Sequence, residues 1–103
     1  MAVYTDLLAK GLATAVFNSV IYTDPNDGRA TVVRCVTLIN YLASTEAWIW
    51  DAIGGSCGSI LNGDPQHTTR VYDLRNRMPA GGSLTLVCAS GQVGYWVTGY
   101  RLS

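Results

Sequence analysis

The chain has 103 residues, of which 49% are hydrophobic and 14% are charged, so it is long enough and apolar enough to fold around one core. Seven basic and seven acidic side chains give a formal net charge of zero, which excludes the surplus of Lys and Arg that non-specific nucleic-acid binding requires. A neutral domain with three Trp and six Tyr is expected to associate with other proteins, because these aromatic residues favour interfaces.

The first fifteen residues lack a clear β pattern. Residues 6–10 would suit a helical turn, but Gly11 follows too soon for a stable helix. We expect residues 1–15 to form an extended or partly helical arm that lies against another surface, or a frayed terminus. The folded domain is then expected to span residues 16–103.

The next two segments are predicted strands. Residues 16–22 are rich in β-formers and end at a cluster of turn residues, 24–28. Residues 31–41 form the strongest strand, and both of its faces are largely apolar, which places it in the middle of a sheet. Strict alternation puts Val33 and Cys35 on one face, and Val36 and Leu38 on the other.

Trp48 and Trp50 share a face of the next predicted strand, 47–51. We expect both in the core, with an interface anchor as the alternative. Glycines then divide residues 54–66, with 59–61 as a possible edge strand, and further strands are predicted at 68–72, 83–89 and 93–102. Seven or eight short strands separated by turns predict an all-β fold, an antiparallel β-sandwich of the jelly-roll kind.

The last predicted strand carries the strongest indication of assembly. Tyr95 and Val97 fall on one face, and Trp96, Thr98 and Tyr100 fall on the other. One set must enter the core. The other set is exposed or is buried against a neighbouring protein, and burial avoids leaving a large apolar patch in water.

Arg70, Arg75 and Arg77 form a local basic cluster around Tyr72. A solvated strand and turn is the expected explanation. The alternative is a surface that meets an acidic patch on a protein partner.

Few residues suggest catalysis. His67 lies in a polar stretch, where we expect a solvated loop position. Residues 54–58 fit the Gly-x-Ser-x-Gly pattern of hydrolases, but the strand-to-helix turn which that motif needs does not follow. A hydrolase built on Ser56, His67 and either Asp64 or Asp73 is therefore the weakest hypothesis, and we predict no enzymatic activity.

Cofactor, metal and membrane sites are not predicted either. Cys35, Cys57 and Cys88 are too widely spaced for a zinc site, and reduced thiols are expected in a protein made in the cytoplasm. The sequence begins without the features of a signal peptide. No apolar run approaches the ~20 residues that cross a bilayer.

One stretch of sequence resembles a known family. Residues 21–33 run from a Tyr-Thr strand through a Pro-Gly turn and a basic residue into a valine-rich strand, and Leu38-Ile39-Asn40 follow. Residues 78–86 and 97–100 supply a second turn-and-strand and a closing strand. Over roughly residues 12–102 the chain resembles small β-sandwich structural proteins of tailed phages. In this chain Gly28 comes one position late, and the strand with Trp48 and Trp50 is unusual.

The resemblance implies a virion protein without enzymatic activity. It implies a capsid decoration (cement) protein that binds the major capsid protein, or else a neck, tail or fibre component. It also implies a homo-oligomer, with a trimer favoured. A carbohydrate-binding β-sandwich that stacks sugars on tryptophan is the alternative of another class. The expected interface residues are Tyr4, Leu7, Leu8, Trp48, Trp50, Arg70, Tyr72, Arg75, Arg77, Trp96 and Tyr100.

Overall fold

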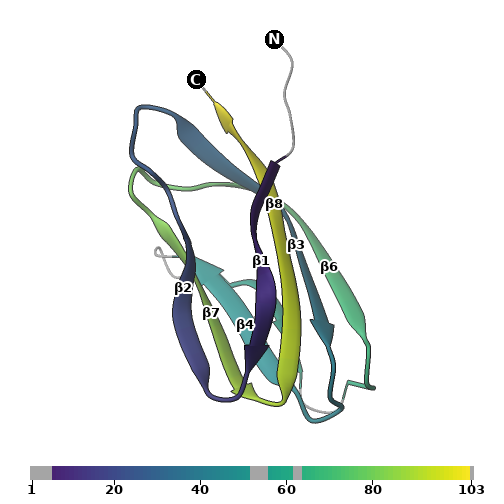
Figure 1. Cartoon of the computed structure of the whole chain (residues 1–103). Helices are drawn as coiled ribbons and strands as arrows, with labels where there is room; N and C mark the ends of the chain where they lie inside the picture. Colours follow the sequence, from purple (N-terminus) through teal and green to yellow (C-terminus); the bar gives the residue numbers. More distant parts are fainter. Residues whose placement is uncertain (1–5, 52–55, 62–63, 103) are drawn as a thin grey trace.

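The computed structural model describes residues 6–51, 56–61 and 64–102, which form eight strands in two antiparallel sheets (Figure 1). Sheet A has the order β1-β8-β3-β6, and sheet B has the order β2-β7-β4-β5. The predicted all-β sandwich is confirmed. The strands are β1 (Asp6–Thr14), β2 (Phe17–Thr23), β3 (Ala30–Asn40), β4 (Glu46–Asp51), β5 (Ser56–Ile60), β6 (Thr69–Arg77), β7 (Ser83–Ser90) and β8 (Gln92–Leu102).

The core lies between the two sheets and is built from alternate residues of the central strands. Leu38 of β3 and Val97 of β8 enter it from sheet A, and Ile49 of β4 and Leu86 of β7 enter it from sheet B. All four side chains are fully buried. Burial of a side chain of this size stabilises the fold by about 1.5–3 kcal/mol, so the sandwich is held mainly by these apolar layers.

A β-bulge in β3 corrects the alternation predicted for this strand. The register with both β6 and β8 shifts between Val33 and Cys35, and Arg34 between them is exposed. Because a bulge adds one residue to its strand, the residues beyond it change sides. Val33 and Val36 therefore both face the core, whereas Cys35 lies on the outer face of sheet A.

Residues 6–14, expected within an N-terminal arm, form the edge strand β1 of sheet A. This strand pairs with β8 from Asp6 opposite Gly99 to Thr14 opposite Gln92. Gly11 lies beside the ring of Tyr95, and a Cβ at Gly11 would stand 2.7 Å from the Tyr95 hydroxyl oxygen. Gly11, which argues against a helix in the sequence, therefore leaves room for the ring of Tyr95 beneath β1.

Residues 59 and 60 of the predicted edge strand 59–61 belong to β5 at the margin of sheet B, and Leu61 follows its end. In the described part of the chain, no helix is long and apolar enough to span a bilayer.

Candidate functional site

The outer surface of sheet A, which we call face A, is organised in rows by the pairing of its four strands. One row crosses β1, β8, β3 and β6 through Lys10, Trp96, Thr37 and Val71. Trp96 is 46% exposed and Val71 is 63% exposed. The two flanking rows contain Leu7, Thr98, Cys35 and Asp73 on one side, and Leu12, Gly94, Ile39 and Thr69 on the other.

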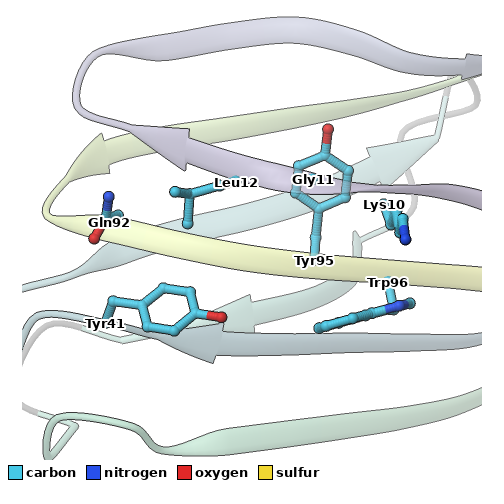
Figure 2. A pocket seen from close by; sticks show the side chains of 7 residues that line it. All are labelled: Lys10, Gly11, Leu12, Tyr41, Gln92, Tyr95 and Trp96. Carbon is cyan, nitrogen blue, oxygen red and sulfur yellow. The ribbon is translucent and has the colours of Figure 1, made fainter.

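A groove of about 430 Å³ opens on face A over β1 and β8 (Figure 2). Leu12, Tyr41 and Trp96 supply apolar walls, and Lys10 and Gln92 supply polar groups. The groove is therefore mainly apolar with a few polar groups at its border, a combination typical of binding surfaces.

Tyr41 and a glycine shape one end of this groove. The ring of Tyr41 lies over Gly94, where a Cβ would stand 2.9 Å from the ring carbon Cε2. His67 meets the same ring edge-on, with 6.0 Å between the centroids. The predicted loop histidine is exposed and supports the position of Tyr41 from the side.

The outer surface of sheet B, face B, carries the other two tryptophans. Trp48 and Trp50 lie on this outer side, with Trp48 half-buried and Trp50 36% exposed. Their prediction as core residues was wrong, because Ala47 and Ile49 take the inner positions of β4 and are fully buried. Val20 of β2, 51% exposed, lies in the same row as Trp50 through Thr85.

Three of the predicted interface residues make contacts within the sandwich instead. Leu8 packs against the core. The hydroxyl of Tyr72 donates a hydrogen bond of 2.8 Å to the Ser59 carbonyl oxygen, which ties β6 to β5. Arg70 pairs with Asp64, with 2.8 Å between Nη2 and Oδ1. Arg70 of the predicted basic cluster is thus engaged with a carboxylate of its own chain.

The other predicted interface residues are dispersed. Leu7, 49% exposed, and the half-buried Tyr100 belong to sheet A, and Arg77 is exposed at the end of β6. Tyr4 and the side chain of Arg75 lie outside the described residues. Sequence reasoning missed Lys10, Leu12, Tyr41 and Val71; the one signal for Val71 is that it alternates with Tyr72 and so faces the opposite side.

Among the side chains that the structure describes, the candidates for catalysis and metal binding are not gathered into one site. Asp64 is held by Arg70, whose guanidinium lowers the pKa of that carboxyl, and the side chain of Ser56 is not described. Among the residues that the structure covers, no group of three or more His, Cys, Asp or Glu is placed to hold a metal ion. Burial raises the pKa of the Cys88 thiol, which makes it a less reactive group.

A buried carboxylate closes the opposite end of the sandwich. Asp24 accepts hydrogen bonds from the Thr31 hydroxyl at 2.5 Å, and from the backbone N–H groups of Gly81 at 3.0 Å and Asn26 at 3.1 Å. These donors, the Thr31 hydroxyl first, lower the pKa of Asp24. Nη2 of Arg101 in β8 lies 3.8 Å from Oδ1 of Asp24, and Arg101 also pairs with Asp27. The cluster therefore joins β3 and β8 to the turns that contain Asp27 and Gly81.

We expect the thermal unfolding midpoint to fall as the pH drops from about 4 to about 2. Arg101 lowers the pKa of Asp27 to about 2, and the pKa of Asp24 is lowered as well. A lowered folded-state pKa gives stability that is present above the unfolded-state value of about 3.9 and is lost as the pH falls through the folded-state value. The measurement is circular dichroism melting between about pH 2 and pH 7.

The matched variants are Asp24→Asn and Glu46→Gln, the latter at an exposed position of β4. Asp24→Asn should lower the midpoint at neutral pH and flatten its acid dependence. Glu46→Gln should leave both unchanged. An acid dependence equally steep in Asp24→Asn would assign the effect to other carboxyl groups.

The chain was also compared with known proteins. No protein-family model and no curated protein matches it. A search of solved structures finds a chain in the structure of infectious bursal disease virus Gx strain, with 10% sequence identity and a TM-score of 0.43 over 95% of this chain. The aligned part is 32% of that viral chain, so this protein spans about a third of its length. A likeness this remote implies neither a family nor a function.

Proposed function

We propose that the chain is a structural protein of a tailed-phage virion, in particular a capsid decoration (cement) protein bound to the lattice of the major capsid protein. The observation that supports this most is that both outer faces of the sandwich present tryptophan. Trp96 lies on face A, and Trp48 and Trp50 lie on face B. Tryptophan is enriched among the residues that dominate protein–protein contacts, so a domain exposing it on two sides is suited to bridging neighbours.

The low charge of the chain supports the same proposal. A formal net charge of zero leaves little long-range repulsion between copies that are crowded on one particle. The resemblance of residues 12–102 to small β-sandwich structural proteins of tailed phages also supports the proposal. The proposed partners are the major capsid protein and other copies of this chain, and no enzymatic step is part of the proposed role.

The test is to look for the chain in density-gradient-purified virions of the phage or prophage that encodes it. An antibody raised against the recombinant chain should detect it in whole particles and in tail-less heads, in many copies per head. Detection on tails alone would assign it to the neck, tail or fibre instead. Its absence from purified particles would contradict the virion role.

A further inference from the structure

We infer that face A binds a second copy of the same chain, and that the two copies pack face to face about a two-fold axis. The axis lies in the interface, parallel to the strands and midway between β8 and β3. The inference does not depend on the virion role. Because the sheet order is β1-β8-β3-β6, this axis places β1 of each copy over β6 of the other, and β8 over β3. Two sheets that pack in this way lie about 10 Å apart, and their strand directions differ by no more than about 30°.

The central row of face A is complementary in size to its own image. The axis places Trp96 opposite Thr37 of the second copy, because these two residues are direct neighbours in the row, one on each side of the axis. A large indole thus meets a small side chain, and two indoles do not compete for the same space. Each copy buries its half-exposed Trp96 in this way.

The margins of face A provide a projection and a hollow. Val71 projects from the edge strand β6 and is 63% exposed. Lys10 and Leu12 border the groove on the opposite edge strand, β1. Since Lys10 and Val71 end the same row, the axis brings Val71 of the second copy to the mouth of the groove beside Lys10.

Charge complementarity favours a second copy as the occupant. Lys10 lies at the β1 margin and Asp73 at the β6 margin, one row beyond Val71, and both side chains are exposed. After the two-fold rotation, Asp73 of the second copy stands one row from Lys10, about 7 Å along the strand. A lysine side chain spans that distance, so the dimer gains the same Lys10–Asp73 contact twice.

The experiment is light scattering during size-exclusion chromatography of the 103-residue chain. We expect a mass twice the monomer mass of 11.1 kDa. Val71→Lys should weaken the dimer at least about tenfold, because it would place a second ammonium group against Lys10 of the other copy. Val20→Lys is the matched control: its position is also exposed and apolar, but on face B, and it should leave the dimer intact.

Charge reversal tests the geometry without relying on Val71. Lys10→Asp and Asp73→Lys should each weaken the dimer, and the combined variant should restore it, since the ion pair is then reversed. Circular dichroism would establish that each variant is folded.

Three results would overturn the inference. One is a wild-type chain that is a monomer at about 100 µM, whether or not its tryptophan emission responds to a panel of glycans. Another is a wild-type trimer. The third is a dimer that dissociates in Val20→Lys and survives in Val71→Lys, which would move the interface to face B. Absence of the chain from virions would leave the inference standing, so the two proposals fail separately.

Discussion

Replacing Gly91 by alanine is expected to cost about 3 kcal/mol of the free energy of unfolding. Gly91 joins β7 to β8 with a φ of 76°, a conformation that costs an L-residue about 1–2 kcal/mol. A Cβ at this position would also stand 2.6 Å from the Thr45 Cα, and closer still to Oγ1. Thr45 has no room to retreat, because it is fully buried and its hydroxyl bonds to the backbone of Leu42 and Gln92. Such a clash adds about 1–3 kcal/mol.

Gly28→Ala is the matched control for this prediction. Gly28 has a φ of 88°, but no heavy atom lies within 4 Å of the Cβ that alanine would add. Only the conformational cost of about 1–2 kcal/mol applies there. Urea unfolding followed by tryptophan fluorescence would measure both variants, and the difference isolates the clash with Thr45. Equal losses in the two variants would mean that Thr45 yields.

The sequence predicted the strands whose side chains alternate or are apolar throughout. β3, β7 and β8 were found on that signal, because burial between two sheets requires it. β1 was not found. Its apolar residues Leu7, Leu8 and Ala9 are consecutive, since the register with β8 shifts between Leu7 and Ala9, and the partner strand lies at the far end of the sequence. Edge pairing with a distant strand leaves little local trace.

The candidate surface could be predicted only in part. Periodicity showed that Trp48 and Trp50 share a face, but which face turns inward depends on the fit between the sheets, where Ala47 and Ile49 are packed. Trp96 was expected on the side opposite Tyr95, and the structure places it outside. Its neighbour Val71 comes from another strand, and the register that joins them in a row is not visible in a single sequence.

Replacing Asn40 by alanine should lower the free energy of unfolding about as much as Gly91→Ala does. Asn40 is fully buried at the end of β3, and its amide holds the loop that leads to β6. Nδ2 donates to the carbonyl oxygens of Asp64 at 3.2 Å and Pro65 at 2.9 Å, and Oδ1 accepts from the Thr68 N–H at 2.6 Å. Alanine would remove all three bonds. An intramolecular hydrogen bond contributes about 0.5–1.5 kcal/mol, so we expect the loss of three to cost about 3 kcal/mol in Asn40→Ala.

Thr68→Val tests whether this cost belongs to the buried amide. It removes only the hydroxyl that donates to Pro65 at an exposed site, for which a loss below about 1 kcal/mol is expected. Urea unfolding gives both values, and hydrogen exchange of the Thr68 amide should accelerate in Asn40→Ala alone. The loop also carries His67, which contacts the Tyr41 ring at the groove, so loosening it should weaken self-association through face A. An Asn40→Ala variant within about 1 kcal/mol of wild type would mean that water replaces the lost bonds, and the groove would then keep its shape without Asn40.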